Sequence, residues 1–433
     1  MVRKLMLILF FVPCLLFGKD LTLKQAIDIA MKNNPQIKAL EENYKASSYG
    51  ESAAKTLKYG ELDLNAGFKK LSDDGLIRPM SKDLILSGLG NMPFDNEYWY
   101  WNLDYKLPIY SGGKIKTTEK IAQERKNSVF YKLKAYKWEL RYQVTKVYLS
   151  ILSVNKRLDS LEKYLESLKS LKSHIDEGVR LGKFAEVDEY KVNFQIELAK
   201  SNIETLKQLR SSLLNSLANL LGEKDLSNYK LESDVDSTPA IPDLTLSSLV
   251  EKAYSNRGDL LNAKSFVKIK KLSVNLAKAD WKPKVSLNAT LMAVNGNNID
   301  YSDKFWTVTA NVSFPLFDMG RRYKKIKQTR REEKSALNFF EGVKLNVKKE
   351  VSDAYTKLQK EFQNYKTAVA SLKFQKEVER IERLKYKNGK GDIDDLLFAE
   401  ARKQMAEASV IKAKYNFFIA KEELKKSIEG ELK

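Results

Sequence analysis

The chain of 433 residues contains only one cysteine and one histidine. Cys14 lies in an N-terminal apolar run, so the rest of the chain can form neither a disulfide nor a thiolate metal site. With His174 as the only histidine, a Ser-His-Asp triad could be built around one residue at most, and a histidine cluster that binds a metal cannot be built. The phosphate-loop pattern GxxxxGKS/T is absent, and no pattern places two acids in an apolar pocket. We therefore expect no enzyme activity, no cofactor and no bound metal.

Long apolar segments are also missing after the N-terminus. No later stretch approaches the roughly 18 uninterrupted apolar residues of a membrane-spanning helix. The N-terminus has a basic start, an apolar run over residues 5–17 and then a small residue, Gly18, which together predict a secretory signal peptide at residues 1–18. Because Cys14 lies within the run and not at its end, lipidation is a disfavoured alternative, as is a retained anchor. The protein is predicted to be exported, and it would have to cross a membrane as strands.

Proline is scarce, with nine residues, and 30% of the chain is charged. This composition favours long solvated helices over a compact enzyme. The net charge of +20 falls by two when the signal peptide, with Arg3 and Lys4, is removed. A basic excess can indicate nucleic-acid binding, but Lys and Glu alternate here along helical segments such as residues 157–173, as on solvated helix faces. No nucleic acid is predicted as a partner.

The sequence resembles itself along its length. The segment "LTLKQAIDIAMKNN" from Leu21 matches "LTLSSLVEKAYSNR" from Leu244, at an offset of 223 residues. Further along, the offset is 207, as Trp99 and Trp306 show, so the first copy has 16 extra residues between its two strands. Self-similarity on this scale predicts an internal tandem duplication.

Each copy is predicted to contain, in order, a short helix, a helix of moderate length, two strands separated by a loop, a very long helix, a glycine-bearing turn and a final helix. The first copy, residues 19–221, has strands at about 61–70 and 98–108 and long helices at about 114–177 and 185–221. A linker with two prolines covers residues 222–243. The second copy, residues 244–433, has strands at about 284–294 and 304–315 and long helices at about 321–388 and 393–430.

The predicted strands alternate apolar and polar side chains. The apolar face carries the aromatic residues Trp99, Trp101, Tyr105 and Trp306, which are predicted to lie at a membrane interface. Segments of about ten residues with one apolar and one polar face are typical of transmembrane barrels. A soluble sandwich is the alternative, but four strands among long helices leave no second sheet to cover the apolar face. Four strands cannot close a barrel, so closure requires several copies of the chain.

The helices after the second strand of each copy are unusually long. At about 1.5 Å per residue, more than 60 residues give a length of roughly 90 to 100 Å. Apolar residues recur in them at heptad spacing, for example Val351, Tyr355 and Leu358. This spacing predicts antiparallel coiled coils.

In this order, and twice, these features resemble the TolC family of outer membrane efflux proteins over essentially the whole mature chain. The resemblance is carried by the paired "LTL" openings, the strand ends "YKLPIYSGGK" and "VSFPLFDMGRR", and the turns "VRLGKFAEVDEY" and "YKNGKGDIDDLLFAEA". It implies a mostly α membrane protein with four strands per chain. The homotrimer would form a 12-stranded β-barrel in outer-membrane lipid and a helical barrel extending into the periplasm. It also implies two partners, a periplasmic membrane-fusion adaptor and an inner-membrane pump of the RND or ABC type.

The resemblance places functional residues at the two helix turns. The family motif is a tip glycine followed by an aspartate early in the returning helix, matched by Gly182 with Asp188 and by Gly389 with Asp395. The residues expected to face the adaptor are Leu181, Gly182, Phe184, Asn388 and Gly389. A purely structural explanation of the glycines stays open, since glycine accepts the positive φ at which two helices reverse.

A periplasmic gate of Asp188, Tyr386 and Asp395 is implied as well. In characterised members, a tyrosine three residues before the second tip glycine bonds to the aspartate of the first turn, and Tyr386 and Asp188 occupy these positions. Gly391 stands where the family often has an arginine and Phe398 where it has a second aspartate, so any latch should be weaker or differently built. Three copies of Asp395 could form an acidic ring that concentrates cations, or the acid could simply favour the helix start.

The predicted function is therefore an exit duct of a tripartite efflux or type I secretion system, which conducts substrates from a pump and adaptor to the exterior. The alternative is a structural coiled-coil envelope protein without transport activity. A basic coiled-coil binding module is a third class, and it predicts a soluble product. The predicted localisation is the outer membrane, with an extension into the periplasm.

Overall fold

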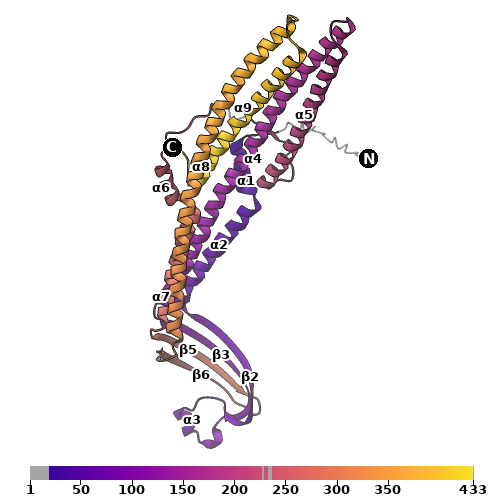
Figure 1. Cartoon of the computed structure of the whole chain (residues 1–433). Coiled ribbons are helices and arrows are strands. Elements are labelled where there is room, and N and C mark those ends of the chain that lie inside the picture. Colours follow the sequence, from indigo (N-terminus) through magenta and orange to yellow (C-terminus); the bar gives the residue numbers. More distant parts are fainter. Residues whose placement is uncertain (1–18, 227–228, 233–236, 433) are drawn as a thin grey trace, which may run out of the picture. The chain divides into compact units, whose positions relative to one another are not determined.

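The computed structural model describes residues 19–226, 229–232 and 237–432. The predicted signal peptide, with Cys14, lies outside them. The first half contains β1 (Lys19–Leu21), α1 (Leu23–Asn33), α2 (Pro35–Thr56), the 3-10 helix η1 (Leu57–Tyr59), β2 (Glu61–Leu76), α3 (Lys82–Leu86), the 3-10 helix η2 (Leu89–Asn91), β3 (Phe94–Tyr110), α4 (Lys114–Arg180) and α5 (Glu186–Leu221) (Figure 1). The second contains β4 (Tyr229–Leu231), α6 (Leu246–Asn256), α7 (Gly258–Ala279), β5 (Lys284–Gly296), β6 (Ser302–Ser313), α8 (Arg321–Lys387) and α9 (Ile393–Ile428).

The helices of the two halves correspond in order and in length. α1 and α6 have 11 residues each, α2 and α7 have 22, α4 and α8 have 67, and α5 and α9 have 36. The recurring "LTL" openings have a local cause, because Thr22 and Thr245 are the N-caps of α1 and α6. Each threonine side chain accepts a hydrogen bond from the backbone N–H three residues later, which satisfies a helix donor that would otherwise lack a partner.

The chain divides into two compact units that do not coincide with the two predicted sequence copies. One unit comprises Lys132–Gly258, Lys344–Lys433 and the chain up to Glu41, and the other comprises Glu42–Tyr131 and Asp259–Val343. Each unit thus contains segments of both copies. The first unit holds both helix turns, and the second holds the four-stranded sheet.

The core of the first unit surrounds the middle of α4. Tyr148 and Leu149 are among its most buried side chains, packed with Leu21, Leu217 and Leu221. β1 pairs in parallel with β4, a pairing that the sequence did not predict. The Tyr148 hydroxyl lies 2.6 Å from the carbonyl oxygen of Leu21 and 2.8 Å from that of Glu232, so it donates to the ends of both strands and attaches them to α4.

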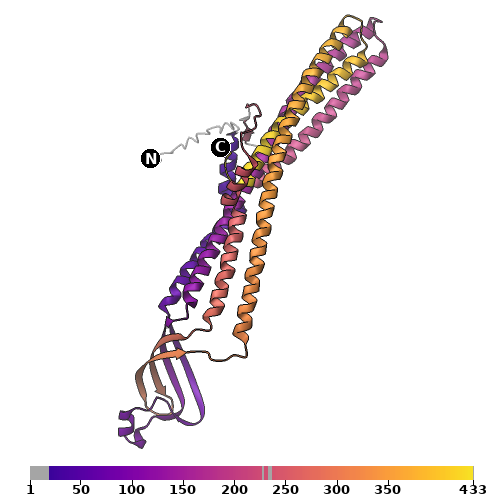
Figure 2. The same ribbon diagram turned by 60° about the vertical axis from the view of Figure 1, so that its left-hand side comes forward.

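The second unit contains one antiparallel sheet in the order β2, β3, β5, β6, with a hairpin from each half of the chain (Figure 2). β2 extends to Leu76 and β3 begins at Phe94, so both exceed the predicted strands 61–70 and 98–108. The extra residues of the first copy form the connection between them, which includes α3 and η2. β2 and β6 are the edges of the sheet, and within the described residues each has a row of backbone groups without a strand partner.

We expect Tyr148→Phe to lower the free energy of unfolding by about 1 kcal/mol, because the carbonyl oxygens of Leu21 and Glu232 lose the hydroxyl that joins them to α4, although Leu21 keeps the backbone N–H of Glu232 as a donor. Denaturant titration measures this change. Tyr49→Phe is the matched control: Tyr49 is 77% exposed, so loss of its hydroxyl should have little effect. Equal effects of the two substitutions would contradict the assigned role of Tyr148.

Candidate functional site

Both long helical hairpins reverse through a glycine turn of the same construction. Gly182 follows α4 with a φ of 67°, and Gly389 follows α8 with a φ of 68°. After each glycine, the next N–H bonds to a carbonyl oxygen of the preceding helix, from Lys183 to Gly178 at 2.8 Å and from Lys390 to Lys385 at 2.9 Å. These bonds satisfy helix ends in the manner of a Schellman motif, which requires a residue that tolerates positive φ.

The residues predicted to face an adaptor differ in exposure. Leu181, Gly182, Asn388 and Gly389 are exposed, and the side chain of Leu181 is 56% accessible. Phe184 is only partly exposed, because its ring packs in the cluster that joins the two hairpins.

Phe184 is the centre of an aromatic cluster below the turns. Its ring stacks on Tyr386 with centroids 6.0 Å apart, and His174 contacts it edge-on at 5.8 Å. Gly178 leaves the space for this ring, since a Cβ atom there would lie 1.9 Å from Cδ2 of Phe184. The cluster continues into the apolar contacts of Val192 and other side chains of α4, α5 and α9.

An ionic link joins the first turn to the second hairpin. Lys191 of α5 lies 3.3 Å from Oδ1 of Asp188 and 3.0 Å from Oδ2 of Asp394 in α9. Hydrogen bonds to Asp394 and then Asp188 outweigh partial desolvation and raise the pKa of Lys191. Lys191 therefore holds together two aspartates that would otherwise repel each other.

The predicted gate residues occupy one neighbourhood but are linked differently from the expectation. Burial, together with the charges of Asp188 and Asp392, raises the pKa of Tyr386, so its hydroxyl stays protonated beside these acids. Among the described residues, no hydrogen bond joins Tyr386 to Asp188, and the partner of Asp188 is Lys191. Asp395 is exposed near the start of α9.

Gly391 has a steric reason to be glycine. A Cβ atom at this position would lie 2.9 Å from Cβ of Lys385 and 3.0 Å from the backbone nitrogen of Tyr386. A larger residue, including the arginine that the family often has here, would require the turn to shift. Lys191 supplies a cation to the tip from another helix.

The sheet has one exposed apolar face. Its register places Leu64, Leu103, Leu291 and Trp306 in one row across all four strands. All four are exposed, and Trp306 is 73% accessible. The other predicted interface aromatics, Trp99, Trp101 and Tyr105, share this face at accessibilities of 52%, 53% and 38%. Trp306 lies in the same cross-strand row as Leu103, so the four aromatics are distributed over several rows along the strands.

The opposite face of the sheet is polar and cross-linked between strands. Asp104 of β3 accepts hydrogen bonds from Asn65 of β2 at 3.0 Å and from Thr290 of β5 at 2.5 Å. Lys106 pairs with Asp63 across the same strands at 3.0 Å. These side chains pair across the strands, although Oδ1 of Asn102 on the same face has no hydrogen-bond partner among the described residues, whereas the side chains of the apolar row are exposed.

In the described part of the chain, none of the helices combines the length and the apolar composition that a membrane span requires. No group of three or more His, Cys, Asp or Glu side chains in the described residues is arranged to hold a metal ion.

Long helical hairpins joined to a sheet that is apolar on one face and polar on the other define the class of outer-membrane channel proteins. The family model "Outer membrane efflux protein" matches residues 26–223 and 249–430, one segment in each half. The chain therefore belongs to this family, as its resemblance to the TolC family predicted. Membership makes it an outer membrane efflux channel and not an enzyme, and confirms the mostly α fold.

Solved structures have the same fold at low sequence identity. The CmeC outer membrane channel of Campylobacter jejuni aligns with a TM-score of 0.79 and 18% identity, over 95% of this chain and 86% of that one. VceC of Vibrio cholerae gives 0.77 and 14%, over 95% and 97%. The open state of the MtrE outer membrane channel of Neisseria gonorrhoeae gives 0.75 and 17%, over 95% and 89%. No curated protein matches the chain significantly.

The sequence reasoning missed Lys191 and Gly178. Lys191 and Asp394 are 203 residues apart, and each looks like an ordinary charge on a helix start. Gly178 could have been noticed in the sequence. Glycine lowers helix stability, so a glycine near the end of a long helix suggests a packing role.

We expect Gly178→Ala to destabilise the tip by about 1–3 kcal/mol, because the new methyl group displaces Phe184 from its stack on Tyr386. Thermal unfolding followed by near-ultraviolet circular dichroism measures the effect. The control is Gly342→Ala within α8, where a Cβ meets nothing within 4 Å and the helix should gain stability. If both substitutions raise the thermal stability of the protein, the proposed role of Gly178 in making room for Phe184 is wrong.

Proposed function

We propose that three copies of the chain form an exit duct, which crosses the outer membrane as a 12-stranded β-barrel and extends into the periplasm as a helical tunnel. The observation that carries this proposal is the sheet, apolar and exposed on one face, polar on the other, and open at both edges. Pairing β6 of one copy with β2 of the next would satisfy the backbone groups at every edge, which lipid cannot do. The polar face would then line the lumen.

The long helices support the same assembly. An exposed apolar stripe on α5 is formed by Val187, Tyr190, Phe194 and Leu198, spaced three or four residues apart. α8 and α9 carry exposed apolar residues at spacings of three and seven, namely Phe374, Ile381, Leu384, Phe398 and Met405. Stripes of this kind on helices need a partner helix, and a neighbouring copy offers the complementary stripe.

The turns at Gly182 and Gly389 are the proposed docking points for a periplasmic membrane-fusion adaptor. Leu181 and Asn388 are exposed beside them. The adaptor would connect the duct to an inner-membrane pump of the RND or ABC type, as in tripartite efflux or type I secretion. Near the turns, Asp188, Tyr386 and Asp395 form the proposed gate, with Lys191 as the link that holds the first turn to the second hairpin.

Reconstitution tests the duct directly. Purified protein is added to planar lipid bilayers, and chemical cross-linking in detergent reports the number of copies. We expect discrete conductance steps from a trimeric species. A trimer that inserts but never conducts, even when the gate is weakened, would favour the structural envelope protein. A product found only in the soluble fraction would favour the binding module.

Lys191→Met should weaken the gate. The substitution removes the cation between Asp188 and Asp394 and leaves the two acids to repel each other. We expect the open probability in planar bilayers to rise by a factor of about two to five, a modest effect because the ion pairs are solvated.

The control for this substitution is Lys200→Met, on the same helix. Among the residues that the structure describes, Lys200 pairs only with Glu197, at 2.7 Å and within α5, so its loss breaks no link between hairpins. Open probability should then match that of the unsubstituted protein. If the two variants have the same open probability, Lys191 is not part of the gate.

A further inference from the structure

The start of α8 has a concentration of positive charge that the rest of this helix lacks. Residues 321–334 include eight basic and two acidic side chains, a net charge of +6. The rest of α8, residues 335–387, includes twelve basic and seven acidic ones, a net charge of +5. A short first segment of the helix therefore carries more excess charge than the whole remainder.

The cations of this first segment lie on the surface of the helix. The side chains of Arg322, Thr329 and Ala336 are buried at a spacing of seven residues and form the packing face of α8. On the opposite face, basic residues spaced three or four apart form what we call the cationic stripe: Lys324, Lys327, Arg331 and Lys334. All four are exposed, and in the described part of the chain none of them forms an ion pair with an acid.

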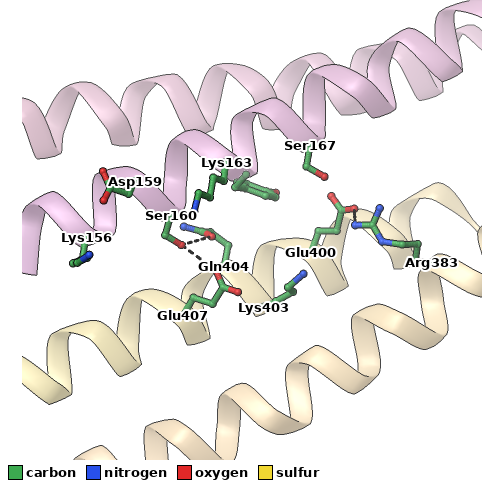
Figure 3. A pocket seen from close by; sticks show the side chains of 11 residues that line it. Lys156, Asp159, Ser160, Lys163, Ser167, Arg383, Glu400, Lys403, Gln404 and Glu407 are labelled. Carbon is green, nitrogen blue, oxygen red and sulfur yellow. Dashed lines mark hydrogen bonds and ion pairs between the residues drawn. The ribbon is translucent and has the colours of Figure 1, made fainter. Parts of the chain in front are cut away.

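Cations near the other end of α8 are matched by acids of the chain. Arg383 borders a cavity of about 440 Å³ between α4, α8 and α9, where it pairs with Glu400 at 2.6 Å (Figure 3) and with Glu379 at 2.5 Å. Arg380 pairs with Glu377 at 2.6 Å. The members of the cationic stripe instead repel one another, unless an anion from outside the chain lies against them.

The linker that leads into α8 is apolar and exposed. Residues 314–320 connect β6 to α8 (Figure 2), and the side chains of Leu316 and Phe317 are 81% and 76% accessible. Met319 is 83% accessible and has a φ of 55°, a backbone conformation that residues other than glycine rarely adopt. Neighbouring apolar side chains displayed in this way indicate a contact surface.

Arg322 fixes this linker in place. It is only 7% exposed, and its Nε donates to Oδ2 of Asp318 at 2.8 Å, while Nη1 donates to the carbonyl oxygen of Pro315 at 2.8 Å. The guanidinium also lies 4.5 Å from the ring centroid of Trp281, which follows α7. The only acid of the linker is thus paired inside the joint and not with the cationic stripe, and the apolar side chains are left outside.

The linker begins where the apolar face of the sheet ends. Val308 and Val312 of β6 are exposed on that face, and Phe314, also exposed, follows directly after the strand. In the proposed barrel this face contacts lipid, so the linker would lie at the level of the lipid headgroups. Side chains of a helix tilt toward its N-terminus, so the first lysines of the cationic stripe would extend back toward the same level.

Distances along the helix divide the cationic stripe into two parts. The headgroup layer is about 5–7 Å thick on each side of the hydrocarbon. At about 1.5 Å per residue, the cationic stripe extends about 15 Å from Lys324 to Lys334. Lys324 and Lys327 would therefore reach the headgroups directly, whereas Arg331 and Lys334 would act on them across solvent.

We propose that the linker and the cationic stripe form a docking surface for anionic phospholipid headgroups on the periplasmic side of the membrane. Leu316 and Phe317 enter the boundary between headgroups and acyl chains, and Lys324 and Lys327 bind lipid phosphate groups. Charge complementarity favours this occupant, because anionic lipids supply the negative charge that the chain itself does not place against the stripe. The inference rests on the proposed function, since it requires the sheet to lie in the outer membrane.

Spin-labelled lipids test this preference. Purified protein is reconstituted in phosphatidylcholine vesicles that contain a trace of spin-labelled phosphatidylglycerol or spin-labelled phosphatidylcholine. EPR spectroscopy then measures the fraction of each label whose motion the protein restricts. We expect the unsubstituted protein to favour phosphatidylglycerol by a factor of about two to five, less at high salt. Combined Lys324→Gln, Lys325→Gln and Lys327→Gln should lower this factor to about one, because three exposed cations near the headgroups are lost.

The matched control makes the same charge change farther along α8, by Lys360→Gln, Lys373→Gln and Lys376→Gln. These three lysines are also exposed and, within the described residues, form no ion pair, so the lipid preference should stay unchanged. Arg331→Gln with Lys334→Gln should have an intermediate effect, since both cations lie beyond the headgroups. Equal lipid preferences of the Lys324 triple variant and the control would overturn the proposal.

Other occupants of the cationic stripe would give different results, and each would also overturn the proposal. If a neighbouring copy covers it, the Lys324 triple variant yields less cross-linked trimer and keeps the lipid preference. If the stripe lines the lumen, the triple variant changes the reversal potential in a salt gradient and keeps the lipid preference. Failure of the proposed function is distinguishable, because a protein that does not insert restricts neither spin label.

Discussion

The constraint on which the rest of the structure depends is the open sheet. Four strands with unpaired edges at β2 and β6, and with a row such as Leu64, Leu103, Leu291 and Trp306 exposed on one face, cannot be stable alone in either water or lipid. In water the apolar row lacks cover, and in lipid the edge amides lack partners. In the proposed assembly, association through the edges pairs these amides, so that lipid can then cover the apolar row, and the exposed apolar stripes of the long helices meet a neighbouring copy.

The helical part holds two hairpins together through contacts of two kinds. Its apolar contacts around Val192 are supplemented by polar links with modest or adjustable strength, such as Lys191 between Asp188 and Asp394. Exposed ion pairs contribute little individually and weaken with salt. The proposed gate would depend on contacts of this kind, because a fully apolar interface would not open under mild conditions.

Much of the fold could be predicted from the sequence, because the patterns that indicate its helices, strands and turns are periodic or local. Alternation identified the two faces of the strands, heptads identified the coiled coils, and glycine at positions 182 and 389 marked the reversals. The pairing of β1 with β4, helix α3 and the Lys191 link were not predictable, because they depend on which distant segments meet. The same holds for Gly178, whose role appears only when the ring of Phe184 is placed above it.

The tight surroundings of Gly391 limit how the tip can change. With backbone and side-chain atoms of Lys385 and Tyr386 where its Cβ would stand, the position admits no single substitution without moving the turn. A cation near this turn therefore has to come from another position, and in this chain Lys191 of α5 provides one, between Asp188 and Asp394.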